Sequence, residues 1–270
     1  MQLDRHRVAI RERSYLEILD LALRVIRVQP GAVLLALAIG ALPIAAINVL
    51  LVTMDTPAME DFFDQGRLQV MLFLVIWELP LATAPLTLYL GQSLFMDRPE
   101  RTAMVRNFFR SLPQLLWFQV FWRGILTVTG VGWLLMYLAW PYMNEVILLE
   151  RNPMWRGRRK RMTAWRRIRA VHSGASGEVV GRGLAAAGIS LLLAGSLCGS
   201  LWVLQGMLFS HWEATGLTVA IVAQTGLWLV AGFFSVVRFL SYLDLRIRRE
   251  GWEVELLMRA EKARLERQWA

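Results

Sequence analysis

The chain has 270 residues, of which 56% are hydrophobic and 19% are charged, yet its formal net charge is +9 and its pI is near 10.7. A soluble domain of this length buries a large core, but it does not need several uncharged apolar runs that each match a bilayer crossing. The single cysteine, Cys198, excludes an intramolecular disulfide and the cysteine pairs of zinc or iron–sulfur sites. The composition therefore predicts an all-α, polytopic transmembrane helical bundle.

The first 30 residues predict an amphipathic cytoplasmic helix. Ser14 and Glu17 have the spacing of a capping box, in which each side chain binds the backbone amide of the other residue. Apolar residues follow at helical spacing, and charged residues occupy the other faces. Such a helix either lies on the membrane surface or is an ordinary cytosolic extension of the first crossing, and the sequence leaves both possibilities open.

Four apolar runs are long enough to cross a hydrocarbon core of about 30 Å, which needs roughly 20 helical residues. They are 31–53, 69–91, 183–209 and 216–237. A fifth stretch, 114–150, is too long for one crossing but fits two short ones, 114–129 and 132–150, with a turn at Gly130 and Gly132. The alternative is a re-entrant hairpin that never reaches the far side of the membrane.

Basic residues predict the orientation, because Lys and Arg concentrate in short cytoplasmic loops. Of the 30 Lys and Arg residues, 28 lie before residue 30, in 92–113, in 151–182 or from 238 onward. If 92–113 and 151–182 both face the cytoplasm, an even number of crossings must separate them. We therefore predict one membrane domain over 1–270, with six crossings, both termini on the inside of the bacterial cytoplasmic (inner) membrane, and a helical cytoplasmic tail at 238–270.

Three ionisable residues lie inside the predicted crossings: Glu78, Arg123 and Glu145. An ionisable group at the bilayer centre costs about 2.5–3.5 kcal/mol on insertion scales, so it normally faces a partner or water. At about 1.5 Å of rise per residue, Arg123 lies between the two carboxylates in depth and is predicted to pair with one of them. Together with Asn144, these residues form the candidate polar cluster. It is either an ion pair that fixes helix register, which we favour, or a polar path beside proline-broken helices.

The loop 151–182 carries ten basic residues and one acidic residue, with aromatic and aliphatic residues among its arginines. Because both ends of the loop continue into apolar helices, anionic lipid headgroups are its nearest partners, at about 1 kcal/mol per basic side chain. A protein partner is the weaker alternative, and we expect no nucleic-acid binding. The candidate lipid contacts are Arg156, Arg158, Arg159, Lys160, Arg161, Arg166, Arg167 and Arg169.

The tail 238–270 mixes basic and acidic residues with an apolar stripe, which predicts a solvated or interfacial helix, or a docking helix for a protein partner. Enzyme motifs such as HExxH, the phosphate loop and GxSxG are missing from the sequence. The three histidines are far apart and lie outside the crossings, so we expect no metal site and no cofactor. The sequence thus indicates a protein without enzymatic activity.

Four segments carry a resemblance to a known family: LEILDLALRVIRVQPGAVLLALAIGALP, PLATAPLTLYLGQSLFMDRPERTAMVRNFFRSLPQLL, WPYMNEVILLERNP and RFLSYLDLRIRREGWEVEL. In this order they resemble the bacterial six-helix membrane domain associated with glycerophosphodiester phosphodiesterases, and related integral membrane proteins. The resemblance spans nearly the whole chain and implies a helical bundle with cytoplasmic termini. It implies little chemistry, because the soluble phosphodiesterase domain has no counterpart here, and the arginine-rich loop departs from the family pattern.

We therefore expect a scaffold, lipid-interacting or accessory subunit in the membrane. The alternative is a small-solute or lipid transporter with a path near Glu78, Arg123 and Glu145, and an intramembrane enzyme is a third class. A filled bundle with paired charges would favour the scaffold, whereas a water-accessible cavity that reaches Glu78 would favour transport.

Overall fold

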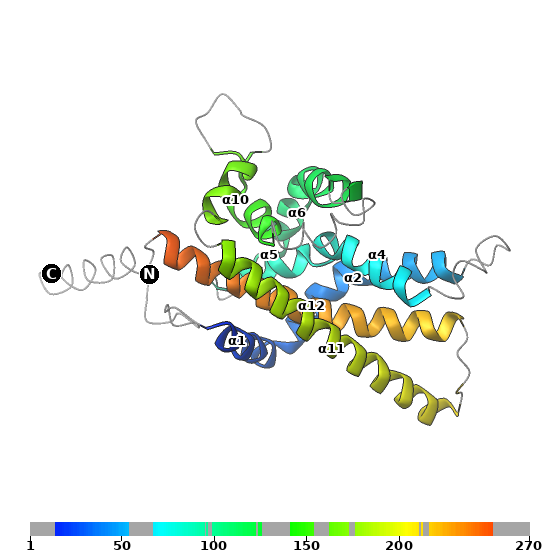
Figure 1. Cartoon of the computed structure of the whole chain (residues 1–270). Coiled ribbons are helices and arrows are strands. Elements are labelled where there is room, and N and C mark those ends of the chain that lie inside the picture. The colour runs from blue at the N-terminus through cyan, green and yellow to red at the C-terminus, as the bar shows by residue number, and fades with distance from the viewer. Residues whose placement is uncertain are drawn as a thin grey trace, which may run out of the picture.

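The computed structural model describes residues 14–53, 67–94, 96, 99–122, 124–125, 141–153, 162–172, 176–210, 212 and 216–250. Every regular element in these residues is a helix, as the composition predicts (Figure 1). In chain order they are α1 (Tyr15–Val28), α2 (Pro30–Thr53), α4 (Arg67–Ala82), α5 (Ala84–Ser93), α6 (Arg101–Leu115), the π-helix η2 (Leu116–Trp122), α9 (Met143–Glu145), the π-helix η3 (Val146–Glu150), α10 (Ala164–His172), α11 (Ser176–Phe209) and α12 (Gly216–Glu250).

Four helical stretches are long and apolar enough to cross a membrane. They are Pro30–Leu51, Val70–Ser93, Gly177–Phe209 and Leu217–Arg248. The central helix is α12, which packs against α1, α2, α4, α5 and α11 (Figure 1). Large apolar side chains point outward from the bundle: Leu42 of α2 is 65% exposed and Leu192 of α11 is 76% exposed. Exposed apolar surface of this kind is typical of a protein that contacts lipid.

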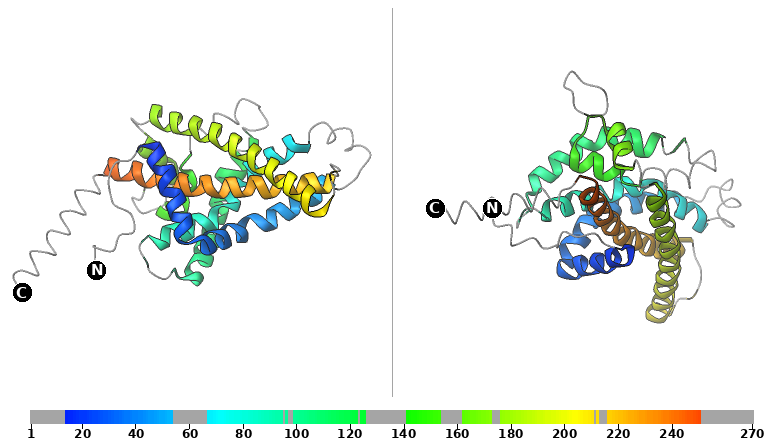
Figure 2. Two further views of the ribbon diagram at one scale, coloured as in Figure 1. Left: turned by 90° about the horizontal axis from the view of Figure 1, so that it is seen from below. Right: turned by 60° about the vertical axis from the view of Figure 1, so that its left-hand side comes forward.

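Helix α1 begins with the predicted capping box. The backbone N–H of Ser14 donates to Oε2 of Glu17 at 2.9 Å, and the backbone N–H of Glu17 donates to Oγ of Ser14 at 3.3 Å. Ile18 and Ala22 are buried in the core, whereas Leu16 is 73% exposed. In the view from below, α1 runs across the direction of α12, against which it packs (Figure 2).

The predicted crossing 69–91 consists of two helices, α4 and α5, with Thr83 between them. Pro85 has no N–H for the carbonyl of the residue four positions earlier, so the backbone hydrogen bonding of one continuous helix is interrupted here. Helix α2 approaches this break at Gly40, where a Cβ would lie only 2.0 Å from the carbonyl oxygen of Ala82. The absence of a side chain at Gly40 therefore allows α2 to pack directly on the broken helix.

The helical stretch that covers the start of the predicted crossing 114–129 begins at Arg101, because α6 and η2 follow each other without a break up to Trp122. The predicted turn at Gly130 and Gly132 lies outside the described residues. The choice between two crossings and a re-entrant hairpin therefore stays a prediction. The chain is described again from residue 141, where a turn leads into α9 and η3.

Helices α11 and α12 both extend beyond the predicted crossings. Helix α11 begins at Ser176, and α12 continues through residues 238–250 of the predicted tail. Arg238 consequently lies inside a helix, between the buried residues Val237 and Phe239. Cys198 packs where the two helices meet, since a Cβ on Gly226 would lie 2.5 Å from its Sγ.

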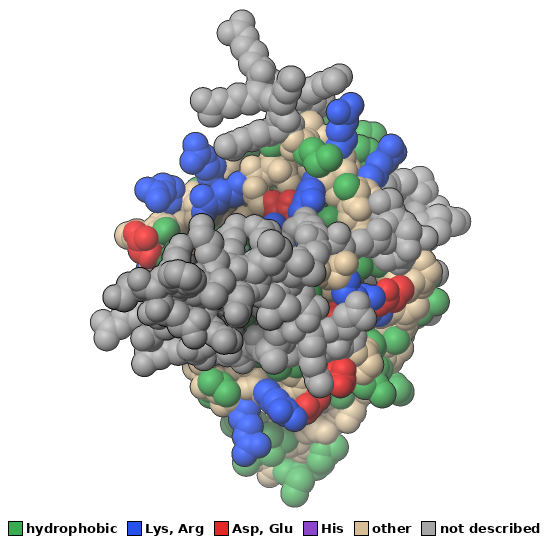
Figure 3. Space-filling view, turned by 90° about the vertical axis from the view of Figure 1, so that its left-hand side faces the viewer, with side chains coloured by type: hydrophobic (Ala, Val, Ile, Leu, Met, Phe, Trp, Pro, Cys, Tyr) green, Lys and Arg blue, Asp and Glu red, His purple; other side chains and the backbone are tan. Residues whose placement is uncertain are grey.

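The core has two main parts. One joins α1, α2, α4, α5 and α12, and the other joins 141–150, α10 and the last part of α12, with Ile147, Ile168 and Tyr242 fully buried. The second part lies at the end of the molecule where basic and acidic side chains gather on the surface (Figure 3). The last turns of α12 therefore connect the apolar bundle to a charged end.

Candidate functional site

The break between α4 and α5 is the centre of a buried polar cluster. At the break, Oγ1 of Thr83 donates to the carbonyl of Leu79 at 2.7 Å. Asn144, in α9, is 1% exposed, and its Nδ2 donates to the carbonyl of Pro80 at 2.8 Å. A buried carbonyl without a donor costs about 1–3 kcal/mol, so Asn144 stabilises the broken helix where its regular bonding is disturbed.

Glu145 follows Asn144 and forms the buried ion pair of the cluster. Its Oε1 accepts a hydrogen bond from Nε of Arg238 at 2.7 Å. The Glu145 side chain is fully buried and that of Arg238 is 12% exposed. Nη2 of Arg238 also lies 3.5 Å from Oγ1 of Thr83. The cluster therefore joins α9, α12 and the break between α4 and α5. Removal of either charge would leave the other charge buried without its ionic partner, which is strongly destabilising.

The structure gives Glu145 a partner that the sequence did not reveal. We predicted that Arg123 pairs with Glu145 or Glu78; Arg123 lies outside the described residues, so its pairing stays a prediction. Arg238 was assigned to the tail because it is the first charge after an apolar run. The sequence SVVRFLSYL around it is apolar on both sides, which is the same signal that singled out Arg123.

Glu78, the third predicted member of the cluster, has a different partner. Its Oε2 accepts a hydrogen bond from Nδ2 of Asn48 at 2.7 Å, which connects α4 to α2. Asn48 is fully buried. It is also the one asparagine in the apolar run 31–53, a signal that could have identified it. The structure thus brings Asn144 and Glu145 together and gives Glu78 a separate contact between helices.

A second network lies near the charged end and is centred on Glu150. Its carboxylate accepts two hydrogen bonds from Arg167 of α10, one of them from Nη2 at 2.9 Å. The hydroxyl of Tyr242 in α12 donates to the same carboxylate. Glu150 is 9% exposed, so this network attaches α10 to the end of the bundle through a mostly buried group.

The candidate lipid contacts are only partly described. Arg166 and Arg169 are exposed on α10, and the guanidinium of Arg169 lies 5.2 Å from the ring centre of Trp165. Arg167 is 19% exposed and is occupied with Glu150. It therefore has a structural contact that the charge pattern did not predict. The other candidates, Arg156, Arg158, Arg159, Lys160 and Arg161, lie outside the described residues.

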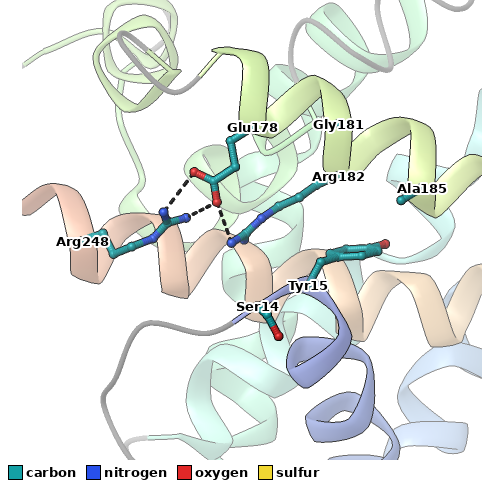
Figure 4. Close-up of a pocket in the computed structure, with 7 residues that line it drawn as sticks. All are labelled: Ser14, Tyr15, Glu178, Gly181, Arg182, Ala185 and Arg248. Atoms are coloured by element: carbon teal, nitrogen blue, oxygen red, sulfur yellow. Dashed lines mark hydrogen bonds and ion pairs between the residues drawn. The ribbon is translucent and has the colours of Figure 1, made fainter.

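A third group of charges lies where the start of α11 meets the end of α12, and we call Glu178, Arg182, Asp244 and Arg248 the arginine cluster. Arg182 contacts Glu178 at 2.7 Å and Asp244 at 2.9 Å. Arg248 forms two hydrogen bonds with Glu178 and contacts Asp244 at 3.1 Å. Glu178, Arg182 and Arg248 of this cluster line an open cavity of about 580 Å³, which also reaches Ser14 and Tyr15 at the start of α1 (Figure 4).

The chain matches no family model, no curated protein and no solved structure. Among the described residues, no group of three or more His, Cys, Asp and Glu side chains is placed to hold a metal ion. The contacts of the buried charges are consequently the main structural guide to function. They bind helices to one another, since each described carboxylate of the polar cluster contacts a side chain from another helix.

Proposed function

We propose that the chain is a non-enzymatic integral protein of the bacterial cytoplasmic membrane that acts as a lipid-interacting scaffold or accessory subunit. The observation that carries this proposal is the buried pair of Glu145 and Arg238. In a scaffold, buried charges fix the register of helices, whereas in a transporter they face a water-filled path. Two further contacts support the scaffold: Arg238 contacts Thr83, and Asn144 donates to the carbonyl of Pro80. Both join polar groups from different parts of the bundle to one another.

The proposed topology has six crossings and cytoplasmic termini. The positive-inside distribution supports it, as does the charged end of the molecule in Figure 3. Helix α1 would lie in the interface, since it runs across α12 and exposes Leu16 on the side away from the core. We also propose that the chain is related to the six-helix membrane domain associated with glycerophosphodiester phosphodiesterases. A protein partner that docks on the C-terminal tail, 238–270, is also part of this proposal.

The topology can be tested by cysteine labelling. In a Cys198→Ala background, single cysteines at Val131, Ala58 and Thr102 would be exposed to a membrane-impermeant maleimide in intact spheroplasts. We expect labelling from outside at 131 and at 58, and labelling at 102 only after permeabilisation. If 131 reacts only after permeabilisation while 58 reacts from outside, the region 114–150 does not cross twice.

The alternative is a transporter with a polar path near Glu78, Arg123 and Glu145. One observation favours it: a narrow cavity of about 40 Å³ is lined by Tyr142 and Arg238, next to the buried pair. In addition, Oε2 of Glu145 accepts no hydrogen bond within the described residues. A path for protons or solutes would need polar groups that are accessible from a cavity, and Arg238 of the buried pair lines this one.

A flux experiment separates the two functions. Proteoliposomes loaded with a pH-sensitive dye would be compared with protein-free vesicles after a pH jump, and fluorescent phospholipids would report lipid movement. A scaffold gives no flux above that of empty vesicles. Flux that disappears in a Glu145→Gln variant that is still folded, but persists in an Arg24→Gln variant, would instead establish the transporter. Arg24 is a suitable control because its ion pair with Asp20 is exposed.

A further inference from the structure

Helix α6 turns large apolar side chains away from the bundle and polar ones toward it. Val105 is 56% exposed and Phe109 is 64% exposed, whereas Asn107 and Ser111 are buried. Val105 and Phe109 are four residues apart, so they lie on one stripe of the helix surface. A helix whose outer side faces water shows the opposite arrangement, with polar residues on the outside. The exposed side of α6 therefore suits contact with an apolar medium.

The apolar stripe continues onto η2, which follows α6 directly. Leu116 is 41% exposed, Phe121 is 50% exposed and Trp122 is 45% exposed. The ring of Phe121 stacks on that of Trp117, with 5.0 Å between the ring centres. The sequence of η2, LWFQVFW, has no charged residue. Tryptophan is enriched where membrane proteins pass between headgroups and hydrocarbon, so η2 has the composition of a segment that enters the membrane there.

The stripe also adjoins a helix that is expected to cross the membrane. Nε1 of Trp77 in α4 donates to the carbonyl of Val120 in η2 at 3.1 Å. Helix α4 belongs to the stretch Val70–Ser93, which is long and apolar enough to span a bilayer. Its Phe73 is 37% exposed and packs against the ring of Trp77. The apolar side of α6 and η2 is therefore continuous with a surface that faces lipid.

Three exposed arginines flank the apolar stripe on α6: Arg101, Arg106 and Arg110. Arg106 and Arg110 each follow a stripe residue directly, so they lie about 100° around the helix from it. Within the described part of the chain, none of the three forms an ion pair or a side-chain hydrogen bond. The sequence 101–122 contains no Asp or Glu. The surface of α6 thus combines an apolar stripe with positive charge that no neighbouring carboxylate compensates.

Anionic phospholipids fit both parts of this surface. An amphipathic helix with a basic edge lies in the membrane interface and buries its apolar side about 5–10 Å below the headgroups. Arginine side chains are long enough to bend from such a helix toward the phosphates. Lipid therefore satisfies the stripe and the arginines together, and it already surrounds the adjoining helix α4.

We propose that α6 lies in the cytoplasmic interface of the membrane and recruits anionic phospholipids, with Val105 and Phe109 in the hydrocarbon and Arg106 and Arg110 at the headgroup phosphates. This surface is separate from the candidate lipid contacts at 156–169. It rests on the proposed function in that the bundle lies in a membrane and residues 92–113 face the cytoplasm.

Fluorescence quenching of the full chain in vesicles tests the depth of α6. In a Cys198→Ala background, Phe109→Cys or Arg106→Cys carries a nitrobenzoxadiazole label. A nitroxide on the acyl chain of a phospholipid should quench the label at 109 more than the label at 106, and iodide in the water should do the reverse. A label at 109 that iodide quenches and the nitroxide does not would indicate a surface for a protein partner and overturn the proposal.

The headgroup preference is measured with the label at 109 in vesicles of dioleoyl phosphatidylcholine. They contain small amounts of nitroxide-labelled phosphatidylglycerol or, for comparison, nitroxide-labelled phosphatidylcholine. Attraction to anionic lipid amounts to about fivefold in local concentration for each basic side chain. Labelled phosphatidylglycerol should therefore reach half-maximal quenching at an at least about fivefold lower mole fraction. Equal quenching by the two lipids overturns the proposal.

Two double variants assign this preference to α6. Arg106→Gln with Arg110→Gln should remove the difference between the two lipids. Arg24→Gln with Arg27→Gln removes the same charge from exposed positions of α1 and should preserve it. A difference that survives the α6 variant, or that the α1 control also loses, overturns the proposal.

This result does not depend on the topology. The vesicles have the same lipids in both leaflets, so quenching is the same whichever side α6 faces. A wrong topology would appear in the cysteine labelling at 58, 102 and 131 and would leave the quenching unchanged. The two proposals therefore fail separately.

Discussion

Nε of Arg238 donates to Oε1 of Glu145 over 2.7 Å and joins two segments that are 93 residues apart in the sequence. The carboxylate is fully buried, and the guanidinium also reaches Thr83 at the break between α4 and α5. Taking both charges out of water carries a large desolvation penalty, which good geometry and further hydrogen bonds must offset. The pair therefore specifies how α9, α12 and the broken helix fit together.

The first prediction concerns this pair. Glu145→Gln keeps the shape of the side chain but removes its charge, so the buried guanidinium of Arg238 loses its ionic partner. The free energy of unfolding should fall by about 3–5 kcal/mol. Thermal or denaturant-induced unfolding in detergent micelles, followed by tryptophan fluorescence, measures the change.

Two further variants make that result specific. Arg24→Gln breaks an ion pair whose side chains are 73% and 60% exposed, so it should change stability by no more than about 1 kcal/mol. The double variant Glu145→Leu with Arg238→Met should recover much of the loss, because neither charge remains buried. A Glu145→Gln protein that unfolds like the wild type would show that the pair does not hold the helices.

The second prediction concerns the close approach of α2 to the helix break. Gly40→Ala would place a Cβ 2.0 Å from the carbonyl oxygen of Ala82, a backbone atom that cannot move aside as a flexible side chain can. We expect destabilisation by about 1–3 kcal/mol, as for other overpacked sites. Gly31→Ala in the same helix meets nothing within 4 Å, so it should be neutral or slightly stabilising. Equal melting temperatures for the two variants would contradict the packing.

Some features of the fold could be predicted from sequence, and others could not. The uncharged runs 31–53 and 183–209 predict α2 and α11 because few structures other than a membrane helix use so many apolar residues. Arg238 was not recognised as the partner of Glu145, since charge counts place the first basic residue after an apolar run in the tail. The close contact of Gly40 with Ala82 could not be predicted either, because it depends on how two helices pack and not on the helix propensity of the local sequence.

The third prediction separates two neighbouring arginines of α10. Arg167→Gln removes charged hydrogen bonds to Glu150, which is 9% exposed, and should lower stability by about 1.5–3 kcal/mol. Arg166 is exposed, so Arg166→Gln should leave the melting temperature unchanged but reduce the shift that added phosphatidylglycerol produces. Unfolding measured with and without this lipid distinguishes the two effects. An identical loss of stability in both variants would contradict the assignment of Arg167 to the Glu150 network.

The fourth prediction concerns Asn144. Asn144→Leu has a similar volume but cannot donate to the carbonyl of Pro80, which would be left buried without this bond. The expected loss of stability is about 1–3 kcal/mol. The loss should be local, because the bond connects α9 to the break between α4 and α5.

Hydrogen exchange measured by mass spectrometry can locate that loss. Amides in peptides that cover 79–90 should exchange faster in Asn144→Leu, since the broken helix opens more readily when α9 no longer holds it. Peptides that cover 183–195 are the internal control, because α11 contacts neither Asn144 nor Pro80 through any described hydrogen bond. Faster exchange in both regions would mean that the substitution loosens the whole bundle. Unchanged exchange in 79–90 would mean that Thr83 and Arg238 hold the break without help from Asn144.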